Sequence, residues 1–594
     1  MPLVRKSYAL PTFVLIFLTY FLFFTLPPGA EVNNIEHHSY DVTDFIEDDD
    51  RIHWTKHEEQ HPIADYISLP TNPPTPIPRI QFEFPSESWL SRVRRRRKQN
   101  AVKEAFKHAW NGYRDNAWLR DELSPLSGGY RNSFSGWAAT LVDSLDSLVI
   151  MGLMDEFEEA LQALEHIDFS TTESLQINVF ETNIRYLGGL LGAHDLTEGK
   201  YPILLKKATE IADFLYGSFD TVNRMPQSRW EWTRSASGLG IRPSGNTILA
   251  ELGSLSLEFT RLTQLTGDQK YFDAIQRISD NLESAQKNTQ VPGLWPMLVD
   301  AQKMLFNDPR YTIGGMADST YEYLPKEHIL LGARTQQYQR MYESAITPIK
   351  ERLLFRPMTK EEKDILFSGN IYAVTSSKKK IEPQAEHLKC FLGGTVGIGA
   401  KVFNRPEELS IARKLTDGCI WAYDIMPTGV MPEIMYLSPC DDSEDCPWDE
   451  AKWYRDVRAR PPKHANIAET DEAAKALIKK LGLYPGVTEI ADARYMLRPE
   501  AIESIFIMYR ITGDKKYQDA AWRMFKNIEK ITWTKYAHAA ISDVRQPVQL
   551  DYMESFWLSE TLKYFYLIFS EPEIISLDEY VLNTEAHPFR LPSS

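Results

Sequence analysis

The chain has 594 residues, of which 43% are hydrophobic and 25% are charged, a balance that excludes a disordered chain and allows a large buried core. Its formal net charge of -16 argues against a nucleic-acid partner, because binding phosphates requires clustered Lys and Arg. The one dense basic run, residues 94–98, is interpreted as a solvated segment at the start of a domain.

The N-terminus carries an uncharged apolar stretch. Residues 8–26 are long enough to cross the hydrocarbon core of a bilayer as a helix. Arg5 and Lys6 precede the stretch and no Lys or Arg follows until Arg51, so the positive end is expected in the cytosol. This predicts a cytosolic tail over residues 1–7, a type II transmembrane signal-anchor over residues 8–26 and a luminal body. A cleaved signal peptide is the alternative, although residues 27–30 fit a cleavage site poorly.

The next segment is acidic and rich in proline. Residues 27–85 include three consecutive Asp at 48–50 and the run LPTNPPTPIP from Leu69, with few apolar residues at any regular period. We therefore expect a disordered luminal stem that carries no chemistry. Residues 86–594 remain as the folded body.

The body reads as helical almost throughout. Apolar residues recur at three- and four-residue spacing over residues 102–118, 141–164, 184–191, 206–215, 248–265 and 499–511. Convincing alternating strands are scarce. The expected fold class is all-α.

One local pattern occurs three times, beginning at Asp195, Gln264 and Arg510. In each copy an apolar helix ends near a Gly that can take a positive φ, and a second amphipathic helix follows. Repeated helix-turn-helix units predict stacked hairpins. Closed into a ring, they form an α/α barrel with helix ends around a central cavity; an open solenoid is the alternative.

Four cysteines are few for a luminal body of this size, so the fold does not depend on a disulfide framework. A luminal compartment lets Cys390 pair with Cys419 and Cys440 with Cys446, whereas unpaired thiols are the alternative. No Cys/His cluster with zinc spacing is present in the sequence.

Several carboxylates lie in apolar or aromatic helical surroundings: Glu181, Asp318, Glu500, Glu503 and Glu560. A buried carboxylate is costly unless it is paired or used. Each alone is more often a salt-bridged or capping group than a catalyst. Aromatic faces beside carboxylates suit sugar rings, and glycoside hydrolysis needs an acid on one side of the bond and a base or nucleophile opposite.

Long ordered motifs carry a resemblance over most of the chain. They include NAWLRDELSPLSG at Asn116, VFETNIRYLGGLL at Val179, ADSTYEYLPK at Ala317, LRPEAIESIFIMYRITGDKKYQD at Leu497 and LNTEAHPF at Leu582. The body resembles the class I α-mannosidases, the calcium-dependent α-1,2-mannosidases of N-glycan processing. The resemblance implies an (α/α)7 barrel, inversion of configuration, oligomannose N-glycans on glycoproteins as substrates and Ca2+ at the barrel floor.

The resemblance also implies site residues. Glu181 matches the family's proposed general acid, Glu500 its proposed general base, and Asp318 a third carboxylate near the scissile linkage. Inversion requires acid and base carboxyls about 6.5 to 9.5 Å apart, which leaves room for a water. Thr584 matches the residue that binds calcium through its carbonyl and hydroxyl oxygens. The carboxylates that balance the charge of the metal from an outer shell are matched by Glu251, Glu503, Glu560 and Glu585.

The remaining matches concern sugar contacts and structure. Arg185 and Arg498 match sugar-contacting arginines, Phe556 a ring that stacks on the terminal mannose, and His387 a histidine near the site. Cys390 and Cys419 match the family's disulfide. Met316 stands where enzymes of the endoplasmic reticulum that remove one mannose usually carry Arg, so we expect removal of several mannoses and a Golgi-like enzyme.

Two other functions remain open from the sequence. One is a mannosidase-like factor that marks misfolded glycoproteins for degradation in the endoplasmic reticulum. The other is a catalytically silent barrel that binds glycans. A silent barrel should keep its affinity for oligomannose without releasing mannose, and a degradation factor should depend on a misfolded protein carrier or partner.

Overall fold

The computed structural model describes residues 51–373, 381–461 and 468–592. The unit that starts at Ile52 consists mainly of α-helices, which confirms the helix-rich prediction. The predicted tail, the predicted signal-anchor and residues 27–50 of the predicted stem lie outside the described residues. In the described ranges, no helix is both long enough and apolar enough to span a bilayer.

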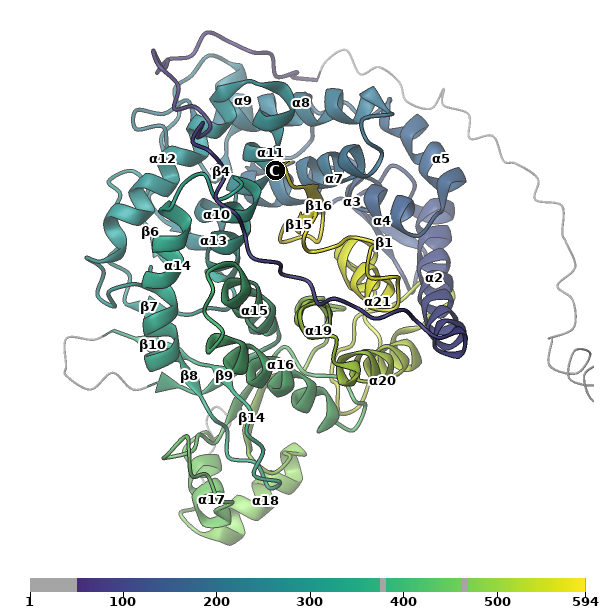
Figure 1. Cartoon of the computed structure of the whole chain (residues 1–594), viewed down its shortest axis with the longest axis vertical. Helices are drawn as coiled ribbons and strands as arrows, with labels where there is room; N and C mark the ends of the chain where they lie inside the picture. The colour runs from purple at the N-terminus through teal and green to yellow at the C-terminus, as the bar shows by residue number, and fades with distance from the viewer. Residues whose placement is uncertain (1–50, 374–380, 462–467, 593–594) are drawn as a thin grey trace, which may run out of the picture. The chain divides into compact units, whose positions relative to one another are not determined.

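Seven helices of the described chain form an inner ring, visible around the centre of Figure 1. Each one contacts the next in chain order, and the turn η6 (Trp557–Thr561), which leads into the last helix, contacts the first. The ring is therefore closed. Its members are α4 (Leu145–Ile150), α7 (Gly188–Leu196), α11 (Ser256–Thr266), α13 (Asp318–Leu330), α15 (Leu392–Val402), α19 (Glu500–Thr512) and α21 (Leu562–Ile568).

An outer helix covers each inner one. Six outer helices directly follow their inner partners, and the seventh, at the start of the body, packs against the last inner helix. In ring order they are α5 (Met154–Leu164), α8 (Pro202–Tyr216), α12 (Gln269–Gln286), α14 (Gln337–Pro348), α16 (Glu408–Asp424), α20 (Lys515–Thr532) and α2 (Trp89–Ala117).

The recurring turns join inner to outer helices in the way the sequence predicts. Gly199, Gly267 and Gly513 have φ of 72°, 77° and 68°, a left-handed conformation that costs other residues energy. After Gly267 and Gly513, Asp268 and Asp514 accept a backbone hydrogen bond at the start of the outer helix. The prediction of a positive φ at these turns is confirmed.

Two predicted continuous helices are interrupted in the structure. Residues 141–164 divide among α3 (Ala139–Asp143), α4 and α5, with Gly152 at φ 65° before α5. Residues 248–265 divide into α10 (Leu249–Gly253) and α11, because the backbone leaves helical geometry at Ser254. Hydrophobic periodicity survives such breaks, so the sequence pattern did not reveal them.

Short antiparallel strands connect the helices, and two of them lie directly before helices that carry predicted site residues. β3 (Ile177–Asn178) precedes α6 (Val179–Thr182) and pairs with β4 (Arg229–Trp230). β5 (Thr247–Ile248) precedes α10 and pairs with β6 (Leu298–Val299). The other strands are β1 (Glu122–Ser124), β2 (Gly129–Arg131), β7 (Arg310–Tyr311), β8 (Leu354–Phe355), β9 (Phe367–Ser368), β10 (Asn370–Tyr372), β11 (Ile381–Glu382), β12 (Gln384–Glu386), β13 (Ile434–Leu437), β14 (Val487–Asp492), β15 (Tyr580–Leu582) and β16 (Pro588–Arg590).

The hairpin β15–β16 lies inside the ring, where Figure 1 draws it in yellow. β15 contacts α13 and β16 contacts α7. The loop between the two strands holds Thr584 and Glu585, and it projects toward the interior of the ring.

Residues 52–85 differ from the predicted disordered stem. Their backbone donates to Asp273 from Ile67, to Asp578 from Ile80 and to the Arg510 carbonyl from Phe82. Figure 1 shows this segment, in purple, crossing the ring. The ordered body therefore begins well before the predicted boundary at residue 86. The segment forms no helix or strand, and acceptors on the rest of the body take up hydrogen bonds from its backbone N–H groups.

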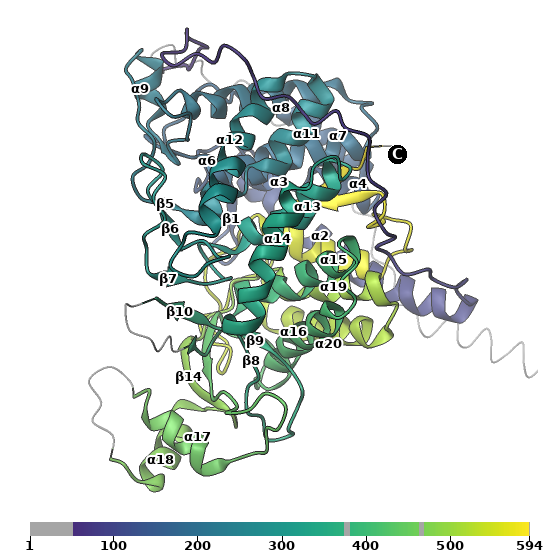
Figure 2. The ribbon, with the colours of Figure 1, turned by 60° about the vertical axis from the view of Figure 1, so that its left-hand side comes forward.

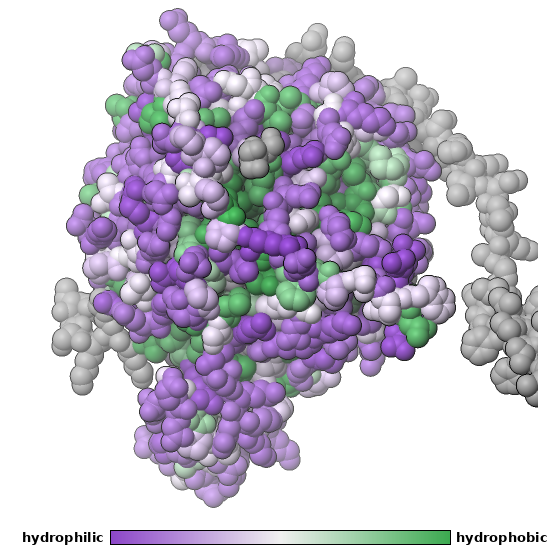
Figure 3. Space-filling view, in the orientation of Figure 1, coloured by the Kyte–Doolittle hydropathy of each residue, from purple (hydrophilic) through white to green (hydrophobic). Residues whose placement is uncertain are grey.

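A small lobe extends from the strands β13 and β14. It contains α17 (Glu450–Arg458) and α18 (Asp471–Leu481), which both Figure 1 and Figure 2 place apart from the ring. The face of the lobe seen in Figure 3 is largely hydrophilic.

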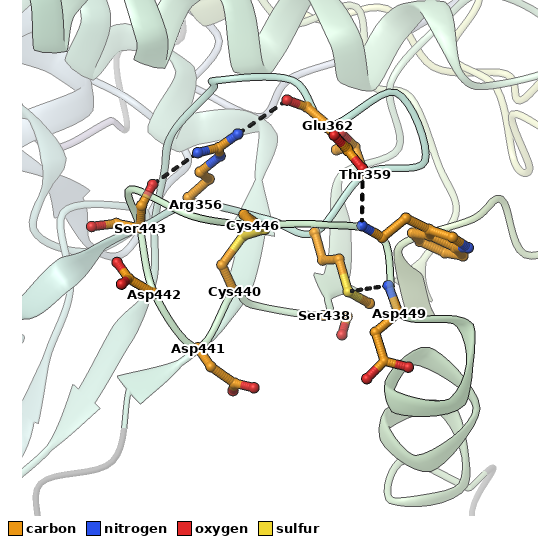
Figure 4. Close-up of a disulfide and its surroundings, with 12 residues drawn as sticks. Arg356, Thr359, Glu362, Ser438, Cys440, Asp441, Asp442, Ser443, Cys446 and Asp449 are labelled. Atoms are coloured by element: carbon orange, nitrogen blue, oxygen red, sulfur yellow. Dashed lines mark hydrogen bonds between the residues drawn. A yellow bond between two sulfur atoms is a disulfide. The ribbon is translucent and has the colours of Figure 1, made fainter.

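Both predicted cysteine pairs are disulfides. Cys390 and Cys419 join the short helix η5 (His387–Phe391) to α16 with 6.0 Å between their Cα atoms, and Cys440 and Cys446 close a short loop at the base of the lobe. Figure 4 shows how Arg356 holds that loop, donating to the carbonyl of Ser443 and, on its other side, to the carbonyl of Glu362.

Candidate active site

One cavity inside the ring gathers almost every predicted site residue. Its wall includes, among the residues named from the sequence, Glu181, Arg185, Glu251, Met316, Asp318, Arg498, Glu500, Glu503, Phe556, Glu560, Thr584 and Glu585. His387 does not line the cavity but lies directly behind Glu500. Residues from across the sequence are thus brought into one place.

Four of these carboxylates sit at the start of helices. Asp318 and Glu500 are the first residues of α13 and α19, while Glu251 is in the first turn of α10. Glu181 is in the first turn of α6, where the Asn178 side chain accepts a hydrogen bond from its backbone N–H at 3.3 Å. Exposed N–H groups and the helix dipole favour negative charge at such positions. The cavity therefore opens over the N-terminal ends of helices.

The Asp318 carboxyl has a pKa raised well above its usual value. Burial is the main cause, and the charges of Glu386, Glu322 and Glu500 add to it, although the backbone N–H of Ser319 opposes the shift. Such surroundings favour the protonated form of the carboxyl. Asp318 is therefore suited to donate a proton.

Glu500 is the opposite case. Burial alone would raise its pKa, but the hydrogen bond and charge of His387 and the charge of Arg498 outweigh burial and lower it. The His387 Nδ1 lies 2.8 Å from a Glu500 oxygen, and its Nε2 lies 2.7 Å from the Tyr423 hydroxyl. An ionised carboxylate only accepts, so His387 Nδ1 donates to Glu500. Glu500 is suited to accept a proton.

Arg185 is the central cation of the cavity. Its guanidinium nitrogens lie 3.0 Å from both Glu181 and Glu585, and 3.7 Å from Asp143. Burial would lower the pKa of Arg185, but these carboxylates outweigh it and raise the pKa well above the usual value. Arg185 therefore stays charged and fixes the acid side of the cavity to its floor.

The floor carries more negative charge than its cations balance. Glu503, Glu560 and Glu585, here called the acidic cluster, are each less than a tenth exposed. Burial is the largest cause of their raised pKa values, and neighbouring carboxylates add to it; that of Glu585 reaches about 8. One Glu585 oxygen is buried and has no hydrogen-bond partner among the described residues. Such an environment suits a cation.

Thr584 stands beside the acidic cluster on the β15–β16 loop, and its backbone N–H donates to the Tyr323 hydroxyl. In the described part of the chain, no three His, Cys, Asp or Glu side chains are arranged to hold a metal ion by themselves. The threonine oxygens are not among those residue types. The orphaned Glu585 oxygen and the acidic surroundings fit a hard cation bound at Thr584 with carboxylates outside it.

The loop that carries Thr584 is fixed from behind by fully buried charges. His587 lies 3.0 Å from Asp143 and 2.8 Å from Asp146, and Lys563 lies 2.9 Å from both Asp146 and the Ala586 carbonyl. Asp143, Asp146, Lys563 and His587 are 0% exposed, and we call them the paired cluster. They determine where the Thr584 loop lies.

Other lining or supporting residues did not stand out from the sequence. Arg229, Glu322 and Glu554 line the cavity, while Glu433 forms an ion pair with Arg498 and Lys326 one with Glu503. Glu554 lies in the segment MESFWLSETLKY at Met553, which also contains Phe556 and Glu560, so the sequence held a signal for it. Arg229 lies on β4, outside every motif, and only the fold brings it to the cavity.

Three comparisons bear on the chain. A model of glycosyl hydrolase family 47 matches residues 105–591. The human endoplasmic reticulum mannosyl-oligosaccharide 1,2-alpha-mannosidase is 32% identical over 88% of this chain, which spans 66% of that enzyme's length. A mannosyl-oligosaccharide alpha-1,2-mannosidase of Coccidioides posadasii is 34% identical over 87% of this chain and 95% of its own length. The solved alpha-1,2-mannosidase of Trichoderma reesei has a TM-score of 0.72 at 30% identity, covering 84% of this chain and 99% of the other.

Proposed function

The chain belongs to glycosyl hydrolase family 47, and we propose that it removes terminal α-1,2-linked mannose from oligomannose N-glycans with inversion of configuration. Membership and its named relatives make it a glycoside hydrolase of the α-1,2-mannosidase type. The observation that best supports the detailed proposal is the cavity that holds a proton-retaining Asp318 and an ionised Glu500 together. The ring of helix pairs is interpreted as the (α/α)7 barrel of the family.

In the proposed reaction Glu500 is the general base. It takes a proton from a water as the water oxygen attacks the anomeric carbon, and the bond from that carbon to the leaving oxygen breaks. His387 holds Glu500 in place through Nδ1, and Arg498 keeps the carboxylate ionised. Attack from the face opposite the leaving oxygen inverts the configuration.

The leaving oxygen receives its proton from the other side of the cavity. We assign Glu181 as general acid, as the family resemblance implies, with Asp318 as the neighbouring carboxyl. The raised pKa of Asp318 makes it a source of that proton, and Glu181 lies 3.0 Å from Arg185. In this arrangement Glu181 donates the proton to the leaving oxygen and Asp318 supplies it to Glu181.

Calcium is proposed as the cofactor. Thr584 would hold the ion through its carbonyl and hydroxyl oxygens, and Glu251, Glu503, Glu560 and Glu585 would balance its charge from the outer shell. When bound, the ion supplies positive charge for the hydroxyls of the terminal mannose. The orphaned oxygen of Glu585 and the excess charge of the acidic cluster support this assignment.

Phe556 and the arginines are proposed to bind the terminal mannose. Phe556 is 4% exposed and lies between Arg185 and Arg498, with the two guanidinium carbons 5.8 and 5.9 Å from its ring centre. A flat apolar face flanked by donors suits a sugar ring. The apolar Met316 at the same cavity supports trimming of several mannoses rather than one.

The location of the enzyme is also part of the proposal. The relatives named for the endoplasmic reticulum support a location in the secretory pathway. We propose a type II protein with a membrane anchor over residues 8–26 and a luminal catalytic body, and a Golgi rather than endoplasmic reticulum residence, from the anchor sequence and Met316.

The test is mannose release from a nine-mannose glycan by the full chain in detergent, with and without a calcium chelator. Glu500→Gln should abolish release, and the chelator should stop it in the unaltered chain. Glu529→Gln is a matched control, because Glu529 also pairs with a buried histidine, His538, at 2.6 Å but lies outside the cavity. Calcium-dependent loss of up to four mannoses supports the proposal, and loss of only one contradicts the inference from Met316. Absence of release from the unaltered chain overturns the proposed reaction.

A further inference from the structure

Arg229 stands out among the residues of the cavity wall because it is exposed, whereas the other described lining residues are buried or half-buried. Its side chain is 49% exposed, compared with 29% for Glu181 and 5% for Glu560 and Glu585. Exposure therefore increases from the floor at the acidic cluster, through Glu181, to Arg229. This order places Arg229 at the mouth of the cavity.

The backbone of Arg229 is held by regular structure. It lies on β4, where its register partner on β3 is Asn178, the residue that caps the helix of Glu181. Its Nη2 donates to Glu251 at 2.5 Å, and Glu251 is only 8% exposed. Arg229 thus connects the strand beside Glu181 to an inner carboxylate, with the rest of its guanidinium toward solvent.

The direction of the substrate follows from the proposed function, on which this inference rests. An enzyme that removes a terminal mannose must place that sugar at the closed floor, so the leaving saccharide extends toward the mouth. A guanidinium offers five N–H donors in a planar fork, and here one ion pair uses only part of them. The hydroxyls of the leaving saccharide are the acceptors that pass closest to it.

We propose that Arg229 is a specificity-determining residue that hydrogen-bonds the leaving saccharide of an oligomannose glycan at the mouth of the cavity. Glu251 fixes the guanidinium while its remaining donors bind sugar hydroxyls. Branches of the glycan present different hydroxyls at this distance from the cleaved bond, so Arg229 discriminates among terminal mannoses. Met316, which lines the same cavity, offers no side-chain donor for this task.

The test compares the full chain in detergent with Arg229→Gln and Arg229→Lys. Three quantities are measured: kcat and KM for a nine-mannose glycan, the proportions of the eight-mannose isomers formed, and the inhibition constant of free mannose, which occupies only the floor. Arg310→Gln is the matched control, because Arg310 is a surface arginine of similar exposure, 44%, that also pairs with a carboxylate, Asp308.

We expect Arg229→Gln to raise KM for the glycan about tenfold, the effect of losing about 1.4 kcal/mol of binding. The kcat should change less than about threefold, the isomer proportions should shift, and inhibition by mannose should stay unchanged. The KM of Arg229→Lys should lie between those of the unaltered chain and Arg229→Gln, because lysine keeps the charge but lacks the planar fork of donors. Arg310→Gln should match the unaltered chain.

Two outcomes overturn the inference. One is an unchanged KM with unchanged isomer proportions. The other is an equal weakening of mannose binding and of glycan binding, which would show that Arg229 acts only through Glu251. Calorimetric titration of the glycan into Glu500→Gln, with and without Arg229→Gln, decides the inference even where turnover fails: a tenfold weaker affinity supports it and an equal affinity overturns it. Failure of turnover in the unaltered chain concerns the proposed reaction alone.

Discussion

Two groups of buried charges face each other across the Thr584 loop, and they differ in balance. In the paired cluster, Lys563 and His587 lie within 3.0 Å of Asp143 or Asp146. In the acidic cluster, Glu560 and Glu585 have raised pKa values, chiefly from burial and then from neighbouring carboxylates. Burying a charge is costly unless a partner compensates it. The paired cluster therefore stabilises the structure. The acidic cluster, whose carboxylates outnumber the nearby cations, is the place where a positively charged ligand would bind.

The largest effect is expected from Asp318→Asn, on the cavity side of this comparison. Loss of the proton should lower kcat by about 10^3-fold or more, within the range of general acid catalysis. Stability should fall little, because burial raises the pKa of Asp318 and so favours its neutral form, which Asn resembles. Mannose release and thermal unfolding measure the two effects, with Asp308→Asn, outside the cavity, as control. A large fall in the unfolding temperature of Asp318→Asn, with that of Asp308→Asn unchanged, would show that Asp318 is a structural residue.

Lys563→Met tests the paired cluster. It leaves Asp146 without its ammonium partner in a fully buried site, which costs about 3–5 kcal/mol of unfolding free energy. Denaturant unfolding measures the loss. Lys516→Met, at an exposed lysine paired with Asp417, should change stability by less than about 1 kcal/mol. Equal effects of the two substitutions would show that the paired cluster has no special structural weight.

Calcium should stabilise the folded protein by binding at Thr584 beside the acidic cluster. At about 100 times its dissociation constant, an ion that binds only the folded chain adds about 2.7 kcal/mol. The unfolding temperature should rise with calcium in the unaltered chain and much less in Thr584→Val. Thr428→Val, at a threonine that bonds a carbonyl away from the cavity, should keep the full response. An undiminished response in Thr584→Val would place the ion elsewhere.

The smallest effect concerns pH and His587. Burial would lower its pKa, but the charge of Asp146 and the hydrogen bonds to Asp143 and Asp146 outweigh burial and raise it. The folded state therefore binds a proton more tightly than the unfolded state. This contribution is fully present below the unfolded pKa of about 6.5 and is lost as pH rises through the raised value.

The unfolding free energy of the unaltered chain should thus decline over that range more steeply than that of His587→Gln. The difference between the two pH profiles is the measurement, because it removes the titration of other groups. Parallel profiles would mean that His587 does not change its proton affinity on folding.

Much of the fold was accessible from the sequence because its signals are local. The three glycine turns at Gly199, Gly267 and Gly513 take the predicted positive φ, since chain conformation at a helix end depends on a few neighbouring residues. The helix breaks at Gly152 and Ser254, and the packing of residues 52–85 on the helices, were not accessible. They depend on partners far away in the chain.

By itself, the sequence determined the helical class and the turns, left the pairing of Cys440 with Cys446 open and, through its motifs, named many of the residues that line the cavity. Only the tertiary structure decided which carboxylates keep a proton, which charges are balanced and which side chain stands at the mouth. Asp318 and Glu500 are both acidic residues at helix starts, yet burial beside carboxylates raises one pKa and His387 with Arg498 lowers the other. Electrostatic energy depends on distance and burial, and both are set by contacts between residues far apart in the chain.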